Sequence, residues 1–123
     1  MHKIALILGS VFAFLGVAIG AFGAHGLKAR LEANDRLDTF ETGVRYQMYH
    51  AFSLLLLALI YQYLPHKLID FSVYLFAAGI LIFSGTLYAL SLTNIRVLGA
   101  ITPLGGLCFL AGWLLLLIAV VKS

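Results

Sequence analysis

Charged residues are scarce in this chain. Only 11% of its 123 residues are Asp, Glu, Lys or Arg, whereas 63% belong to the hydrophobic set. A soluble domain carries about 25% charged residues, and a soluble domain of this size could not bury so much apolar surface. The composition therefore excludes an ordinary soluble domain and indicates one integral membrane domain over residues 1–123.

Cysteine is almost absent, and the basic residues are dispersed. The single cysteine, Cys108, excludes an intrachain disulfide, and inside an apolar run it is typical of a small apolar filler. The eight Lys and Arg residues give a net charge of +3 but form no basic face, which argues against nucleic acid as a partner. Their scatter over short loops is typical of juxtamembrane charge that orients a chain in the lipid bilayer.

Long apolar runs dominate the rest of the chain. Four of them are each long enough to cross about 30 Å of hydrocarbon. They predict an all-α integral membrane fold, an antiparallel bundle of four transmembrane helices. The predicted spans cover residues 4–24, 43–64, 71–92 and 97–121. The first run exceeds the apolar core of about 7–15 residues in a signal peptide, so we expect it to be a retained helix.

The only long polar stretch is the connection between the first two predicted spans, residues 25–42. Within it Leu27 and Leu31 are four residues apart, which places both on one face of a helix. This spacing predicts a short amphipathic segment that lies at the membrane surface.

The second helix is expected to begin outside the lipid. Asp35 followed by Asp38 resembles a capping box with Asp in place of the usual Glu, which predicts a helix start near Asp35. Glu41 and Arg45 are four residues apart, in the order that favours a helical ion pair.

Small residues recur at spacings of three, four and seven along the predicted spans. On a helix these spacings put them on one face, and a face without large side chains lets another backbone approach closely in lipid. The pattern predicts close helix packing, and its abundance predicts a homo-oligomer. The expected packing residues are Gly9, Ala13, Gly16, Gly20 and Gly23 in the first span, Gly85 in the third, and Gly105 and Gly112 in the fourth.

Polar side chains are concentrated toward one membrane side. If residue 1 lies on side X, the first span ends on side Y, the second and fourth begin there, and the third ends there. The candidate polar cluster or ligand-binding residues on side Y are His25, Arg45, Tyr46, Gln47, His50 and Tyr88. We expect His25, Arg45, Gln47 and His50 to form one inward-facing network, because water is not available inside lipid. Trp113 is expected in or near an aromatic belt on side X.

Three interpretations of this cluster stay open: a hydrogen-bond network that joins helices, a site for a small molecule or lipid headgroup, and a metal or haem site. The spans contain no Glu-x-x-His pattern, no cysteine pair and no carboxylate, so no metal ligands and no cofactor are assigned. No carboxylate accompanies a Ser and a His within the bundle, so no catalytic residue is assigned either.

The positive-inside rule gives a small difference between the two sides. Side Y carries five Lys and Arg residues, and side X carries three together with the amino terminus. Counting favours side Y as the cytoplasmic side.

Several motifs together resemble one family over essentially the whole chain. They are GAFGAHG at 20–26, TGVRYQMYH at 42–50, FSGTLY at 83–88, ITPLGG at 101–106 and GW at 112–113. They are similar to the small bacterial inner-membrane proteins of unknown function that are related to eukaryotic transmembrane protein 256, the domain of unknown function 423. The resemblance implies a small multi-span protein of the bacterial cytoplasmic membrane and supplies no catalytic residues.

The combined expectation is a non-enzymatic integral membrane protein that supports membrane organisation or integrity. Its partners would be the lipid bilayer, further copies of itself and other membrane proteins. The alternative is a binder or carrier of a lipid, quinone or other apolar small molecule through the side Y cluster. A second alternative is a metal or redox protein based on His25 and His50.

Overall fold

Every regular element that the structure describes is a helix, which confirms the all-α class. The structure is a computed structural model, and it describes residues 2–123. Its elements are α1 (His2–Ala24), α2 (Lys28–Ala33), α3 (Leu37–Tyr63), α4 (Lys67–Gly79), the π-helical turn η1 (Ile80–Ser84), α5 (Gly85–Thr93) and α6 (Leu98–Lys122).

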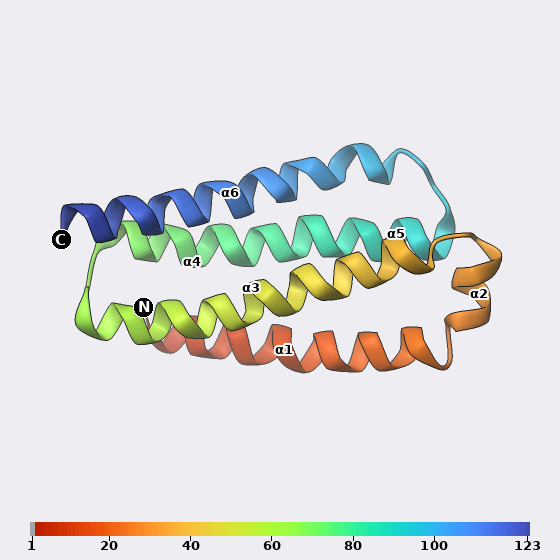
Figure 1. The fold of residues 1–123 in the computed structure, drawn as a ribbon, viewed down its shortest axis with the longest axis horizontal. Helices are drawn as coiled ribbons and strands as arrows, with labels where there is room; N and C mark the ends of the chain where they lie inside the picture. Colours follow the sequence, from red (N-terminus) through yellow and green to blue (C-terminus); the bar gives the residue numbers. More distant parts are fainter. Residues whose placement is uncertain (1) are drawn as a thin grey trace.

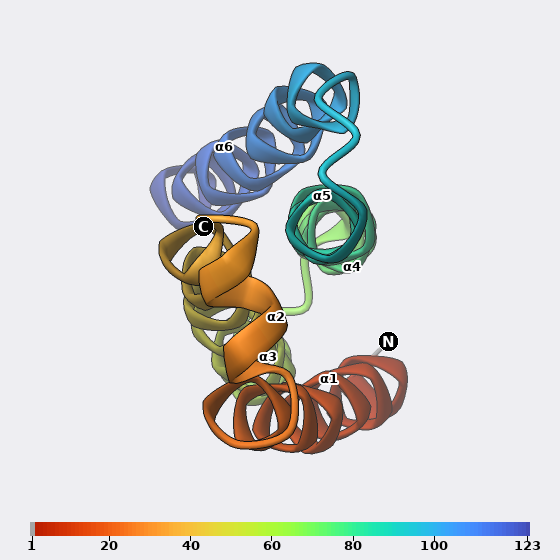
Figure 2. The ribbon, with the colours of Figure 1, turned by 90° about the vertical axis from the view of Figure 1, so that its right-hand side faces the viewer.

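The helices form four long rods that lie side by side (Figure 1). α4, η1 and α5 are continuous and make one of these, called here the α4–α5 rod. The main contacts join α1 to α3, α3 to the rod, and the rod to α6, so each rod packs mainly on its neighbours in sequence (Figure 2). Both termini and the α3–α4 connection lie at one end, the terminal end; α2 and the α5–α6 turn lie at the other, the α2 end. The α2 end corresponds to side Y.

Three of the four rods are long and apolar enough to cross a membrane: α1, the α4–α5 rod and α6. α3 is as long as the others, with 27 residues, but its first half carries acidic, basic and amide side chains. Leu54, Leu57 and Ala58 in its second half are buried in the core with Ile69 and Phe76 of the rod. α3 therefore combines a polar half at the α2 end with an apolar half at the terminal end.

The expected capping box at Asp35 is wrong. Asp35 adopts the left-handed conformation, with φ of 56°, and it ends α2 instead of starting α3. The N–H of Arg36 donates to the carbonyl of Leu31 at 2.9 Å, and that of Asp35 donates to Glu32 at 3.0 Å, which is the Schellman pattern of a helix C-terminus. α3 then begins at Leu37 without a side-chain cap.

The expected ion pair between Glu41 and Arg45 is also wrong. Within residues 2–123 the ion pair with nitrogen and oxygen within 4.0 Å joins Lys28 to Glu32, at 3.9 Å. The Arg45 guanidinium donates instead to the hydroxyl of Thr42, at 3.1 Å. The spacing permitted the pair, but an exposed pair contributes little free energy, and a closer neutral acceptor competes with it.

The glycines of α1 face α3. A Cβ added to Gly9 would lie 2.8 Å from the Leu55 side chain, and one added to Gly20 would lie 3.3 Å from Val44. Added Cβ atoms at Gly16 and Gly23 would overlap Met48 and Phe40. The half-buried Ala13 packs against the same core. These small residues let α1 and α3 approach closely along most of their length.

Gly85 is not a packing residue. It is exposed, and a Cβ added to it would meet no atom within 4 Å. The seven-residue spacing from Ala78 predicted a shared face, but η1 lies between the two positions. A π-helical turn adds one residue to the helix, which rotates everything after it by about 100°. Gly85 is thereby turned away from the face that Ala78 occupies.

The backbone of α6 packs directly on η1. A Cβ added to Gly105 would overlap the backbone nitrogen of Phe83 and lie 2.8 Å from its Cα. A Cβ added to Gly112 would overlap the Phe76 ring at 2.6 Å. Pro103 lies in the sixth position of α6, two residues before Gly105. Two predicted packing glycines therefore join α6 to the rod.

Candidate functional site

Gln47 joins three rods, and its partner on α1, Phe12, lies at the middle of that helix. Its side-chain amide donates to the backbone carbonyl of Phe12 on α1 at 2.8 Å, and its carbonyl oxygen accepts from the hydroxyl of Tyr88 on α5 at 2.5 Å. The side chain is 3% exposed. The Gln47 bridge, meaning Gln47 with these two partners, therefore connects α1, α3 and α5.

Gly16 makes the contact with α1 possible. A helical side chain covers the turn that precedes it, so a side chain at position 16 would cover the carbonyl of Phe12. A Cβ there would lie 3.5 Å from the donating nitrogen of Gln47. The glycine thus exposes a backbone acceptor that an ordinary residue would hide.

His50 forms a second polar contact, between α3 and α6. Its Nδ1 lies 2.8 Å from the carbonyl oxygen of Tyr46, and its Nε2 accepts from the indole N–H of Trp113 at 3.1 Å. The ring stacks on Phe109, with centroids 3.6 Å apart and planes at 8°, and the ring of Phe76 approaches its edge. We call Tyr46, His50, Phe76, Phe109 and Trp113 the His50 cluster.

These contacts define the protonation state of His50. A carbonyl can only accept, so Nδ1 carries the hydrogen, and an indole N–H can only donate, so Nε2 is unprotonated. The neutral Nδ1–H tautomer satisfies both ring nitrogens, whereas a second proton on Nε2 would point at the Trp113 hydrogen. Both nitrogens are occupied, so His50 offers no lone pair to a metal ion in this arrangement.

Trp113 does not belong to a belt on side X. Thirteen residues of α3 precede His50 and thirteen follow it, so the His50 cluster lies at the middle of the helix. Trp113 is 40% exposed, but its indole N–H turns toward α3, where His50 supplies an acceptor. Trp113 lies fifteen residues into α6 and His50 thirteen into α3, which gives similar depths from the α2 end. The sequence hid this match, because the predicted second span begins at residue 43 and the helix begins at Leu37.

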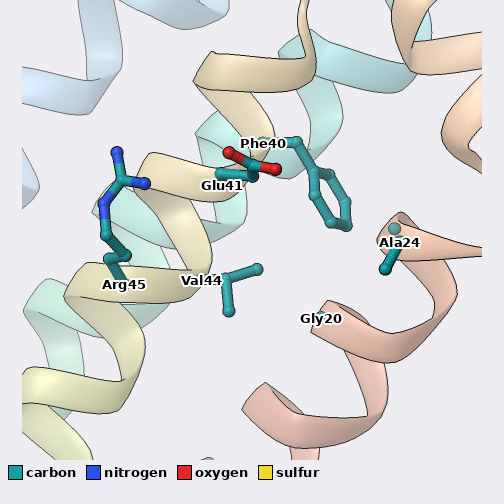
Figure 3. A pocket seen from close by; sticks show the side chains of 7 residues that line it. Gly20, Ala24, Phe40, Glu41, Val44 and Arg45 are labelled. Carbon is teal, nitrogen blue, oxygen red and sulfur yellow. The ribbon is translucent and has the colours of Figure 1, made fainter.

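The expected network of four residues is only partly present. Gln47 and His50 point inward and are buried, but each belongs to its own group of contacts. His25 is exposed in the turn after α1 and has no side-chain hydrogen bond within residues 2–123. Arg45 is exposed. His25 follows the end of α1, and the Arg45 side chain extends from α3 away from Gly20 and Ala24 (Figure 3), so both reach the surface instead of the interior.

Serine hydroxyls form a set of contacts that sequence reasoning missed. Ser84 of η1 donates to the carbonyl of Gly43 on α3 at 2.6 Å, and Ser72 of α4 donates to the carbonyl of Gly112 on α6 at 2.8 Å. In both cases the acceptor belongs to a glycine. Depth along the predicted spans gave no signal for these pairs, because Gly43 begins the second span whereas Ser84 lies eight residues from the end of the third.

Hollows flank α1 on both sides. One, of about 280 Å³, lies between α1 and the start of α3, lined among others by Gly20, Phe40 and Val44. In Figure 3 the Arg45 side chain extends away from Gly20 and Ala24, so its charge does not point into this hollow.

On the other side of α1, two adjoining hollows of about 280 and 160 Å³ lie between α1 and the rod. They share Ile19 and Tyr88, so we treat them as one feature, the α1–rod groove. Its lining residues are Phe12, Leu15, Ile19, Phe22, Leu27, Phe40, Gln47, Ile80, Leu81, Gly85, Tyr88 and Leu92.

Among residues 2–123 no group of three or more His, Cys, Asp or Glu side chains is arranged to hold a metal ion. The polar groups gathered between the rods are hydroxyl, amide, imidazole and indole. These groups can donate and accept hydrogen bonds between helices.

Comparison with known proteins identifies the family. The family model described as a protein of unknown function (DUF423) matches residues 19–106. The chain is 45% identical to the UPF0382 membrane protein YwdK of Bacillus subtilis, with 98% of each chain covered. It is 43% identical to the UPF0382 membrane protein SH2409 of Staphylococcus haemolyticus, with 98% and 97% covered. The chain belongs to this family. No solved structure matches it.

Membership in the DUF423 family confirms the resemblance found in the sequence motifs. It also confirms a bacterial membrane protein, because the relatives are named membrane proteins and three rods are suited to cross a bilayer. The names of the relatives state no activity. Any molecular role has to be argued from the contacts described above.

Proposed function

We propose that this DUF423 protein is a non-enzymatic four-span protein of the cytoplasmic membrane that supports the organisation and integrity of the bilayer. The observation that carries the proposal is the engagement of two polar side chains buried on α3, Gln47 and His50. The hydrogen-bonding groups of Gln47 and His50 meet partners on neighbouring helices or on their own helix. Such groups join helices and leave few donors or acceptors for a substrate.

The path of the chain supports a fourth span. α1 ends at the α2 end, and α4 begins at the terminal end (Figure 1). If α1 and the rod both cross the bilayer, α3 must cross it in the opposite direction to connect them. The buried positions of Gln47 and His50 remove the amide and the imidazole of α3 from lipid, which makes such a span tolerable. α2 would then lie at the interface on the cytoplasmic side.

The test is deletion of the gene in its bacterium, followed by dye permeability measurements under osmotic and detergent stress. We expect permeability to rise, and to return to normal with the wild type or with Leu56→Ala. A Gly105→Leu variant, which forces a side chain onto the Phe83 backbone, should not restore it. Unchanged permeability under all stresses would contradict the proposal.

A metal or redox role for the histidines has its own test. Because both His50 nitrogens are engaged, we expect the purified protein to show no visible absorbance band and no stoichiometric metal. A bound metal that is lost in His50→Phe would overturn this part of the proposal.

We also propose that the protein forms a homo-oligomer through α1. The glycines of α1 are used against α3, so the contact would involve the opposite, apolar face, where Phe14 and Val17 are 74% and 64% exposed. Crosslinking between cysteines introduced at position 14 in native membranes should yield dimers. A monomer as the sole product would argue against this contact.

A further inference from the structure

The α1–rod groove has the length and lining of a site for a lipid tail. Along the rod it runs from Ile80 to Leu92, twelve residues or roughly 18 Å. One leaflet contributes about half of the roughly 30 Å hydrocarbon core. The groove therefore follows the membrane from the α2 end through about one leaflet. Apolar side chains of α1 form one wall and the rod forms the other, on the same side of α3 (Figure 2).

Two features of the rod open this space. Gly85 lines the groove, and a Cβ there would meet nothing within 4 Å. The other glycines that line rod contacts are filled by neighbours of the same chain, as Gly79 is by Phe109. η1 turns Gly85 out of the contacts with α3 and α6 and into the groove.

A cation lies at the mouth of the groove. The Nε–H of Arg30 donates to the carbonyl of Leu92 at 3.2 Å, and Leu92 lines the groove. This bond fixes the guanidinium at the rim. Among residues 2–123 Arg30 forms no ion pair within 4.0 Å. The ion pair at this end of the molecule joins Lys28 to Glu32. Its two Nη groups are therefore open to an anion.

The carboxylates near this end of the groove do not pair with the Arg30 guanidinium. Glu32 is paired with Lys28, and together with Asp35 and Asp38 it lines a separate hollow. Arg36, like Arg30, donates its Nε–H to the end of the rod, here to Asn94 at 3.1 Å. Two guanidinium groups are thus anchored at this end of the rod.

We infer that the α1–rod groove binds one anionic phospholipid from the leaflet at the α2 end, with an acyl chain in the groove and the phosphate on Arg30. A planar guanidinium matches phosphate through two parallel hydrogen bonds. The cytoplasmic leaflet carries a negative surface charge, which agrees with the excess of basic residues on side Y. This inference goes beyond the proposed function, which requires no particular lipid.

The position of the polar groups favours a phospholipid over a quinone. A quinone would need unengaged donors at the deep end of the groove. There, the Gln47 amide already donates to the carbonyl of Phe12 and accepts from the hydroxyl of Tyr88. The unengaged donors are at the mouth, on Arg30, where the headgroup of a membrane lipid lies.

The experiment is native mass spectrometry of the full chain, released from nanodiscs that contain equal amounts of phosphatidylglycerol and phosphatidylcholine with identical acyl chains. We expect the wild type to retain one phosphatidylglycerol. Arg30→Gln should lower the preference for phosphatidylglycerol about fivefold, equivalent to about 1 kcal/mol. Gly85→Leu should release both lipids, because its side chain fills the groove.

Two matched variants test whether the loss of any arginine, or the filling of any surface hollow, changes lipid retention. Arg45→Gln removes an exposed arginine at the same end, and Ala21→Leu fills a different surface hollow on α1; both should retain phosphatidylglycerol as the wild type does. Circular dichroism should show that Arg30→Gln folds normally, so its readout stays valid if Gly85→Leu does not fold.

Three outcomes would overturn the inference. Equal retention of both lipids by the wild type would show that Arg30 selects no headgroup. Undiminished retention by a folded Gly85→Leu would place the lipid elsewhere. A quinone mass, or a change of oligomeric state in Gly85→Leu with unchanged lipid, would assign the groove to a different occupant.

Discussion

The interface between α1 and α3 and the interface between the α4–α5 rod and α6 both rely on glycine, but in different ways. Against α1, the atoms nearest the glycines belong mostly to side chains, as with Met48 at Gly16 and Val44 at Gly20. Between the rod and α6, Gly112 also meets a side chain, the Phe76 ring, but Gly105 meets the backbone of Phe83. A side chain can change its rotamer, whereas a backbone in a packed helix cannot move without its neighbours.

The polar contacts of the two interfaces differ in the same sense. Among residues 2–123, one side-chain hydrogen bond joins α3 to α1, from Gln47 to the carbonyl of Phe12. Two join the rod to α6, from Ser72 to the carbonyl of Gly112 and between the hydroxyls of Thr86 and Thr102, at 2.6 Å. The comparison teaches that α1 is the more adjustable element and that the rod and α6 form the rigid part.

The largest expected effect is at Gly105. Gly105→Ala and Gly106→Ala gain the same helix propensity, but an added Cβ at 105 overlaps Phe83, whereas one at 106 lies 3.9 Å from the Phe83 ring. We expect Gly105→Ala to lower the free energy of unfolding by about 3 kcal/mol, because overpacking against backbone is poorly relieved. Unfolding in mixed detergent micelles would measure it. Equal stability of the two variants would contradict a rigid α6 contact.

Gly16→Leu should have the next largest effect, about 2 kcal/mol of overpacking. It displaces the flexible end of Met48 and crowds Gln47. Gly20→Leu should cost less, since Val44 at 3.3 Å is its nearest neighbour. Leu56→Ala is the control, because Leu56 is 47% exposed and its loss leaves no enclosed cavity. Thermal stability in detergent should follow this order; if all three variants melt together, α1 is not held by its glycines.

The sequence predicted the glycine contacts of α1 and α6 better than those of the rod. Small residues at regular spacings on a straight helix define one face, which is why the sequence predicts Gly9 and Gly16 as packing residues. The same periodicity failed at Gly85, because no local pattern announces the extra residue of η1. The deep polar contacts were harder still: Gln47 and His50 were expected to point inward, but Phe12 contributes only a backbone carbonyl, which has no residue-type signal.

A smaller effect is expected from the Gln47 bridge. Gln47→Leu removes two hydrogen bonds and leaves the Tyr88 hydroxyl without its acceptor, whereas Tyr88→Phe removes one bond and its donor together. Hydrogen bonds between membrane helices average about 0.6 kcal/mol and reach about 1.7. We therefore expect a loss of about 1.5 kcal/mol for Gln47→Leu and about 0.6 for Tyr88→Phe, measured by unfolding in bicelles. A Tyr88→Phe loss as large as that of Gln47→Leu would mean that the bond to Phe12 contributes nothing.

The smallest effect separates two serines that look alike in sequence. Ser53 on α3 and Ser72 on α4 each donate to the carbonyl four residues earlier, at 2.7 and 3.1 Å, and both are buried. Only Ser72 also reaches another helix, at Gly112. Replacement by Ala removes the same atom at both sites, so the difference between the variants isolates the bond between helices. We expect Ser72→Ala to lose about 0.6 kcal/mol more than Ser53→Ala, and the difference should vanish in a Gly112→Ala background, where the added methyl already pushes Phe76 and α4 away from α6. If the difference persists there, the hydroxyl of Ser72 stabilises α4 itself and does not hold the rod to α6.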